Sequence, residues 1–246
     1  MSHAPVRHAF PRPLVPGRLV RRYKRFLADV VLDDGRELTA HCPSPGAMTG
    51  LDHPGSRVWL AHHDDPKRKL AWSWVLASDG DVLVSFDGTS SNRFVADAIA
   101  AGAMLPLAGY AELKREVRVD GASRVDLRLA DHPDDPRPCW VEVKTATLGG
   151  PGGLALFPDA VTARGLRHLE ALAARVAAGD RAVILYLCKR ADARALAPAE
   201  DVDPAYARGL RDAVAAGVEA LAWRADVTPQ AITLAAQLPV LLTSTR

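Results

Sequence analysis

The first third of the chain alternates apolar and polar residues in short runs, which is the pattern of half-buried β-strands. The run Arg18–Leu32 is predicted as one long strand, bent where the alternation lapses, and Asp34-Gly35 predicts the hairpin turn that closes it. Four further strands are predicted at Arg36–Cys42, Ser56–His63, Lys69–Ala77 and Asp81–Phe86. Five short strands without a convincing helix predict a small closed barrel, and the oligonucleotide-binding OB-fold is one such barrel.

After Ser90 the pattern changes to helices that alternate with strands. Helices are predicted at Asn92–Met104, at Asp159–Gly179 with Asp159 as N-cap and Gly179 as the stop, and from the Asp203-Pro204 cap onward. Strands are predicted up to Ala130, again from Cys139, at Arg181–Cys188, which is apolar on both faces, and in two weaker runs near the end. This order predicts an α/β (α+β) domain with one mixed sheet. The predicted domains are therefore residues 1–88 and 89–246, with the boundary near Asp87 to Ser91.

Composition narrows the class of protein only modestly. Lys and Arg number 31 against 29 Asp and Glu, so the total charge indicates no partner. Residues 1–28 hold seven Lys or Arg and no acid, but their prolines lead straight into a strand, so they are interpreted as part of the fold rather than as a transit peptide. No run approaches the roughly 18 apolar residues of a membrane span. Three well-separated cysteines without C-x-x-C predict neither a disulfide framework nor a zinc module, and a cytoplasmic protein is expected.

The segment "VEVK", Val141–Lys144, raises the question of which face of a strand carries chemistry. Alternation directs Val141 and Val143 to one face and Glu142 and Lys144 to the other. Two interpretations are open: an edge strand with an ion pair facing solvent, or a strand whose polar face looks into an active site.

A second polar pair strengthens the active-site interpretation. In "RVDLRL", Val125, Leu127 and Leu129 are expected to share one face, which leaves Asp126 on the other. Pairing across the Pro-rich turn would bring Asp126 beside Glu142 and Lys144. Two carboxylates suit Mg²⁺ or Mn²⁺, a bound cation lowers the pKa of an attacking water, and the lysine can orient that water. An exposed Asp126 that pairs with Lys144 remains the structural alternative.

Neighbouring helices offer weaker candidates. Arg164 and His168 are four residues apart, so they lie on one helix face and can reach a phosphate, although the spacing alone slightly favours an ordinary solvated flank with His168 as a half-buried packing residue. Asp97 on the preceding helix is a candidate third metal ligand, although a lone helical acid is more often simply exposed. The loop Gly149–Gly153 lacks the G-K-[ST] of a nucleotide P-loop, so a mobile flap and a linker both remain open.

The barrel segment carries candidate nucleic-acid contacts. "RRYKRF" interleaves cations with aromatic rings, which permits phosphate contacts and base stacking, and "PKRK" adds a second basic cluster on a turn. A strand with arginines facing solvent is the structural alternative. The candidate residues are Arg21, Arg22, Tyr23, Lys24, Arg25, Lys67, Arg68 and Lys69.

Several blocks, spread over nearly the whole chain, resemble the sugar fermentation stimulation protein A family. They include "RYKRFLADV", "GLDHPGSRVWL", "DPKRKLAW", "SRVDLRL", "VEVKTATL", "FPDAVTARGLRHL" and "DPAYARGL". The resemblance implies an OB-like barrel followed by a PD-(D/E)xK nuclease-type domain, DNA binding, and a link to sugar utilisation. It also implies that Asp126, Glu142 and Lys144 form the nuclease-type triad, with Arg164 and His168 as the helix motif that follows.

The chain departs from the family pattern outside this triad. Ser44-Pro45 stands where relatives usually have Asn-Thr, Thr145 follows the motif lysine, and Asp97 replaces a usual Glu. These changes affect expected substrate contacts more than metal chemistry. Two functions are carried forward: a Mg²⁺- or Mn²⁺-dependent nuclease, and a DNA-binding regulatory protein that does not cleave. The strandedness of the DNA and the oligomeric state stay open, and no membrane partner is expected.

Overall fold

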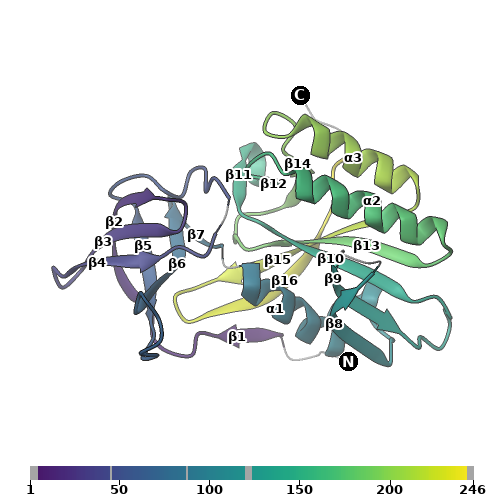
Figure 1. Ribbon diagram of the computed structural model, residues 1–246, viewed down its shortest axis with the longest axis horizontal. Helices are drawn as coiled ribbons and strands as arrows, with labels where there is room; N and C mark the ends of the chain where they lie inside the picture. Colours follow the sequence, from purple (N-terminus) through teal and green to yellow (C-terminus); the bar gives the residue numbers. More distant parts are fainter. Residues whose placement is uncertain (1–4, 45, 87, 120–123, 243–246) are drawn as a thin grey trace.

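The first third of the chain forms a closed barrel, coloured purple to blue in Figure 1. The computed structural model describes residues 5–44, 46–86, 88–119 and 124–242. The barrel sheet has the order β4-β3-β2-β5-β6-β7, and pairing of His41 with Ser73 joins β4 to β6 and closes it. Its strands are β2 (Val15–Tyr23), β3 (Leu27–Leu32), β4 (Glu37–His41), β5 (Arg57–His62), β6 (Trp72–Asp79) and β7 (Val82–Ser85). The small closed barrel predicted from the sequence is confirmed.

The predicted single strand at Arg18–Leu32 is wrong. It is a hairpin, in which β2 pairs antiparallel with β3 from Gly17–Leu32 to Tyr23–Leu27. The turn lies at Lys24 and Arg25, whose φ angles of 47° and 65° are left-handed. Non-glycine residues seldom adopt this conformation, so the sequence carries none of the usual turn signals at this point.

The second domain is built on a mixed sheet with the order β1-β16-β15-β13-β10-β9-β8. The apolar strand β13 lies at its centre and pairs in parallel with both β10 and β15, as its two buried faces predicted. The strands are β1 (Arg7–Ala9), β8 (Glu112–Arg118), β9 (Arg124–Ala130), β10 (Cys139–Ala146), β13 (Arg181–Cys188), β15 (Glu219–Val227) and β16 (Ala231–Leu238). Although the sequence grouped residues 1–88 together, β1 pairs with β16 in this sheet rather than joining the barrel.

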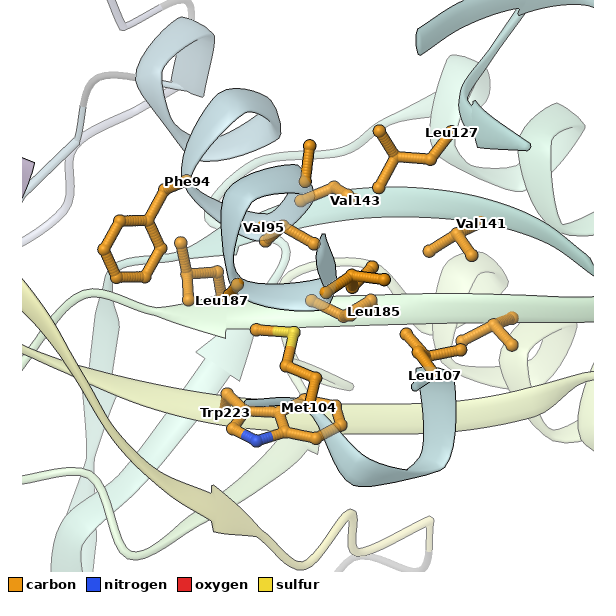
Figure 2. Packing of buried hydrophobic residues seen from close by; sticks show 14 of the residues in the cluster. Phe94, Val95, Met104, Leu107, Leu127, Val141, Val143, Leu185, Leu187 and Trp223 are labelled. Atoms are coloured by element: carbon orange, nitrogen blue, oxygen red, sulfur yellow. The ribbon is translucent and has the colours of Figure 1, made fainter. Parts of the chain in front are cut away.

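Helices cover both faces of the mixed sheet. Helix α1 (Gly88–Ala100) and the short η1 (Leu105–Leu107) pack on one face, where Phe94 and Val95 meet Val141, Val143 and Leu185 (Figure 2). Helices α2 (Ala163–Ala177) and α3 (Pro204–Ala215) lie on the other face (Figure 1). They pack there against Trp140, Ile184 and Tyr186. Asp87, at the expected domain boundary, lies outside the described residues.

The glycine-rich segment is neither a flap nor a linker. It forms β11 (Leu148–Gly150), η2 (Pro151–Gly153) and β12 (Leu154–Phe157), which pair with β14 (Ala195–Pro198) in a small sheet. Gly149 is required for packing, because a Cβ there would lie 2.4 Å from the guanidinium of Arg190.

One predicted helix cap is confirmed and another is wrong. Asp203 caps α3 by accepting a hydrogen bond from the Tyr206 amide at 2.9 Å, as predicted. The predicted cap of α2, Asp159, is wrong, because Thr162 caps this helix and accepts from the Gly165 amide at 3.0 Å. Asp159 instead accepts from the Met48 amide of the barrel at 3.0 Å.

The buried Arg190 fastens the barrel to the second domain. Its side chain, 5% exposed, reaches Asp79 of the barrel at 3.0 Å, Asp192 at 2.7 Å and the Thr147 carbonyl at 3.0 Å. A backbone bridge from Val84 to Arg190 continues the same contact. Within the described residues, no helix is long and apolar enough to cross a membrane.

We expect Arg190→Ala to lower the free energy of unfolding by about 2–3 kcal/mol, because it leaves a buried carbonyl and two carboxylates without their cation. Urea denaturation measures this loss. Arg211→Ala, which removes a half-exposed pair with Glu200, is the control and should cost less than about 1 kcal/mol. Equal losses in the two variants would contradict a clamping role for Arg190.

Candidate functional site

The polar face of β10 points into the layer beneath α2. Val141 and Val143 belong to the apolar cluster under α1, whereas Trp140 and Ala146 belong to the cluster under α2. Strand alternation therefore carries Glu142 to the α2 face, together with Lys144. The edge-strand interpretation of this segment fails, because β10 lies between β9 and β13 and Glu142 is only 4% exposed.

Glu142 is a buried carboxylate held by two partners. Lys144 Nζ lies 2.7 Å from Glu142 Oε1, and His168 Nδ1 also contacts that oxygen. Burial alone would raise the pKa of Glu142, but the hydrogen bond from His168 and the positive charge of Lys144 outweigh it, so the pKa is lowered. The pair therefore keeps Glu142 ionised inside the protein.

The hydrogen bonds around His168 indicate which ring nitrogen carries the hydrogen. Arg164 Nε donates to His168 Nε2 at 3.2 Å, and a guanidinium has no acceptor. Nε2 is therefore the unprotonated nitrogen, and Nδ1 carries the hydrogen that points to Glu142. Lys144 Nζ, 3.2 Å from the same Nδ1, cannot donate to it and directs its proton to Glu142 instead. Arg164 and His168 lie together, as their spacing predicted.

Asp126 lies where β9 separates from β10. The paired residues run from Cys139–Leu129 to Val141–Leu127. At the next position the Val143 amide donates to Asp126 Oδ2 at 2.8 Å, so a carboxylate replaces the backbone acceptor of a neighbouring strand. Val125 packs under α2, which corrects the expectation that it shares a face with Leu127 and Leu129.

A negative charge on Asp126 is energetically unfavourable at this position. Burial, followed by repulsion from Glu142, raises its pKa from 3.8 to about 6. Asn92 on α1 offsets part of this cost by donating to Asp126 Oδ1 at 2.6 Å. The predicted meeting of Asp126, Glu142 and Lys144 on adjacent strands is thus seen in the structure.

Two cavities flank this cluster. A cleft of about 690 Å³ holds Asp126 and Lys144 and extends to the barrel residues Pro43, Ser44 and Gly46. A second cavity, of about 480 Å³, holds Glu142 and His168 and is bordered by arginines of α2. Arg164 lines both cavities, so it stands where they meet.

Asp97 does not join this group. It lies on α1 with a half-exposed side chain, where it pairs with His8 Nε2 at 3.0 Å and with Arg93 Nε at 3.7 Å. It lines neither cavity. The polar residue of α1 that contacts Asp126 is Asn92.

Four of the barrel candidates, Arg21, Arg22, Tyr23 and Arg68, form hydrogen bonds within the protein, the last by donating to Ser73 Oγ at 2.9 Å. Arg21 pairs with Asp29 at 2.8 Å, and the Tyr23 hydroxyl donates to the same carboxylate at 3.2 Å. Arg22 is 10% exposed and donates to the carbonyls of Ser44, Gly46 and Ala47, which shape the loop beside the cleft. Exposed cations remain on two turns: Lys24 and Arg25, and Lys67, Arg68 and Lys69.

Sequence patterns missed Asn92, Glu116 and Asp159, all of which line the cleft. Glu116, on the edge strand β8, contributes to the raised pKa of Asp126 and has a left-handed φ of 54°. No local spacing indicated these residues, because each reaches the cleft through a contact between distant segments.

The fold defines a two-domain protein in which an OB barrel precedes a mixed-sheet domain with few helices. Residues 20–86 match the SfsA N-terminal OB domain, and residues 89–231 match the sugar fermentation stimulation protein RE domain. The chain belongs to the sugar fermentation stimulation protein family.

Relatives and a solved structure agree with this assignment. A sugar fermentation stimulation protein homolog of Geobacter sulfurreducens is 52% identical over 231 residues, covering 94% of this chain and 97% of the relative. A homolog of Caulobacter vibrioides is 48% identical over 228 residues, covering 93% and 95%. The structure of Pyrococcus furiosus SfsA in complex with Ca²⁺ matches with a TM-score of 0.84 and 26% identity, covering 98% of this chain and 99% of that one.

The raised pKa of Asp126 predicts a pH-dependent stability. The folded carboxyl holds its proton up to about pH 6, whereas an unfolded aspartate releases it near pH 3.9, so ionised Asp126 destabilises the fold at neutral pH. We expect Asp126→Asn to raise the free energy of unfolding by on the order of 2–3 kcal/mol at pH 7.5 in metal-free buffer. The gain should disappear as the pH falls from 6 to 4.

Urea titrations at several pH values measure this difference, with the exposed Asp81→Asn as control. Glu142 acts in the opposite sense, because its lowered pKa gives stability that is present above about pH 4.5 and lost below it. Its effect therefore begins only at the acid end of the pH window of Asp126. A gain in Asp126→Asn that does not change with pH would contradict the raised pKa.

Proposed function

We propose that this protein is a divalent-metal-dependent nuclease that hydrolyses phosphodiester bonds in DNA, with a PD-(D/E)xK-type site. The observation that carries the proposal is the meeting of Asp126, Glu142 and Lys144 beside a cleft of about 690 Å³. Arg115 and Arg164 border the same cleft and can contact phosphate.

The donor set fits Mg²⁺ or Mn²⁺. Burial and then repulsion from Glu142 raise the pKa of Asp126, and a divalent cation held by both carboxylates would relieve the repulsion. The described residues contain no cluster of three or more His, Cys, Asp or Glu side chains suited to a metal. Two carboxylates suit a cation that also binds waters and phosphate oxygens, as Mg²⁺ does. The Pyrococcus furiosus relative is described in complex with Ca²⁺, another oxygen-preferring cation.

In this proposal each side chain has a separate task. The cation would lower the pKa of an attacking water and neutralise charge on the phosphate. Lys144, at the edge of the cleft and bonded to Glu142, orients the water or stabilises developing charge. Arg164, oriented by His168, binds a phosphate oxygen. Asn92 and the Val143 amide hold the Asp126 carboxylate in place.

In this proposal the barrel contributes affinity for the DNA strand. Lys24, Arg25, Lys67 and Lys69 are exposed on its turns and would contact phosphates, whereas Arg22 would act by shaping the loop beside the cleft. Binding through phosphates weakens steeply as salt increases. We propose a cytoplasmic location, because the three cysteines are unpaired and the proposed substrate is cellular DNA.

A DNA-binding regulatory protein without cleavage is the second candidate. It is favoured by the internal partners of Glu142, because Lys144 balances its charge and His168 hydrogen-bonds to it without a metal. The two candidates differ only in whether a divalent cation produces cuts.

Cleavage of labelled single- and double-stranded DNA with Mg²⁺, Mn²⁺ or EDTA separates them. We expect metal-dependent cutting that falls about 10²–10³-fold in Lys144→Ala and in Asp126→Ala, because each removes a group that acts on the reacting phosphate. Binding, followed by fluorescence anisotropy, should persist in Lys144→Ala.

Lys114→Ala is the matched control, because this exposed lysine pairs with Glu112 away from the site. It should cut like wild type. Tight, salt-sensitive binding with no cutting under any metal would overturn the nuclease and leave the regulatory candidate.

A further inference from the structure

The smaller of the two cavities beside Glu142 is bordered by four arginines. Arg124 lies at the start of β9, and Arg164, Arg167 and Arg175 lie along α2. This arginine cavity has a volume of about 480 Å³ and meets the larger cleft at Arg164, which lines both. Its place beside the proposed nuclease site makes it a candidate for binding a part of the substrate that is not cleaved.

Three of these arginines have no acidic partner in the part of the chain that the structure describes. Arg175 pairs with Asp180, whereas Arg164 donates through Nε to His168. Arg124 and Arg167 are exposed, and their side chains form no ion pair or hydrogen bond with any other described residue. One unpaired surface arginine is common, but three around one cavity create a positive potential that attracts anions.

The carboxylate in the wall of the arginine cavity does not cancel this charge. Glu142 is the only acid among the described residues that line the cavity. Lys144 already bonds to it at 2.7 Å, and His168 Nδ1 contacts the same oxygen. Because Lys144 balances the charge of Glu142, the positive charges of the arginines remain available to a ligand.

The wall of the cavity suits a phosphate better than a base. Its aromatic residue Trp140 is only 7% exposed, and the guanidinium carbons of Arg175 and Arg128 lie 4.6 Å and 5.6 Å from the ring centroid. A buried ring that already contacts two cations offers little surface for base stacking. Recognition therefore rests on the arginines, whose planar forks of N–H donors match phosphate oxygens.

A terminal phosphate matches this charge better than a backbone phosphate does. A phosphate monoester carries about −1.5 to −2 charges at pH 7 and three strong acceptor oxygens, whereas each backbone phosphodiester carries one charge. Arg124 and Arg167 reach the cavity from two different elements, β9 and α2. Arg164 has further N–H donors besides the Nε that is bonded to His168.

We propose that the arginine cavity binds the terminal phosphate of a DNA strand while the neighbouring phosphodiester lies in the cleft. Arg124 and Arg167 bind the terminal phosphate, and Arg164 stands between it and the phosphate that is cleaved. The protein therefore prefers strands that carry a phosphorylated end. The site rests on the proposed function in taking DNA as its ligand, but its preference is a property of binding and can be measured without cleavage.

Fluorescence anisotropy with the full chain in EDTA tests this preference. Short single strands and duplexes, labelled on an internal base, carry a 5′-phosphate, a 3′-phosphate or hydroxyl groups at both ends. We expect one of the two phosphorylated forms to bind about tenfold more tightly than the hydroxyl form, because it adds charge-assisted hydrogen bonds to arginine. A strand one nucleotide longer with hydroxyl ends adds its phosphate as a diester and should gain less than about twofold.

Variants locate the terminal phosphate. Arg124→Ala and Arg167→Ala should each remove most of the preference, while affinity for the hydroxyl form changes less than about threefold. Both side chains are exposed, so their replacement leaves stability nearly unchanged. Arg208→Ala is the matched control, because this exposed arginine of α3 lines neither cavity, and it should keep the full preference.

Equal affinity for all three forms would overturn the terminal-phosphate site, as would a preference that survives in both Arg124→Ala and Arg167→Ala. A gain of the same size from both ends, or from the longer hydroxyl-ended strand, would reflect total charge alone and also overturn it. Cleavage assays with Mg²⁺ or Mn²⁺ separate this site from the nuclease. Cutting without an end preference in binding overturns only the terminal-phosphate site, whereas an end preference without cutting overturns only the nuclease.

Discussion

Burial of the Glu142 charge is the constraint on which the second domain depends. A carboxylate with 6% of its side chain exposed needs a cation and hydrogen-bond donors, and the strand supplies only Lys144. The other partner, His168, comes from α2, so the helix has to dock at one position. Asp203 fixes that position from the other side, because its carboxylate accepts from the amide of Thr162, the cap of α2, and from Tyr206 in α3. The starts of both helices are therefore tied to one side chain.

Two features around Asp126 lower the stability of the fold. A continuous β9–β10 ladder would satisfy the Val143 amide with a backbone carbonyl, whereas here Asp126 does so with a charged group whose pKa is raised to about 6. Glu116 adds repulsion and a left-handed backbone on the edge strand. Unfavourable features of this kind persist where a site needs them, which agrees with the proposed chemistry at this gap in the sheet.

Sequence reasoning succeeded where structure follows from local periodicity. The faces of Glu142 and Lys144 followed from strand alternation, and the α3 cap followed from Asp203-Pro204. It failed at the Lys24–Arg25 turn, because left-handed lysine and arginine give no turn signal.

Contacts between residues that are distant in sequence could not be predicted either. Asp159 bonds to the barrel instead of capping α2, and Asn92 reaches Asp126 across 34 positions, so no pattern within a single element records either contact. The arginine cavity was likewise not predictable, because its walls come from β9, β10 and α2, which only the complete fold brings together.

The pairing of β1 with β16 has a consequence for how the protein is made. These strands lie near opposite ends of the described chain, whereas the barrel strands are all close in sequence. During translation the barrel can form early, while the mixed sheet has to wait for its last strands to leave the ribosome. A nascent chain would carry a closed barrel before it possessed a finished mixed sheet, so the order of synthesis sets the order in which the two domains can fold.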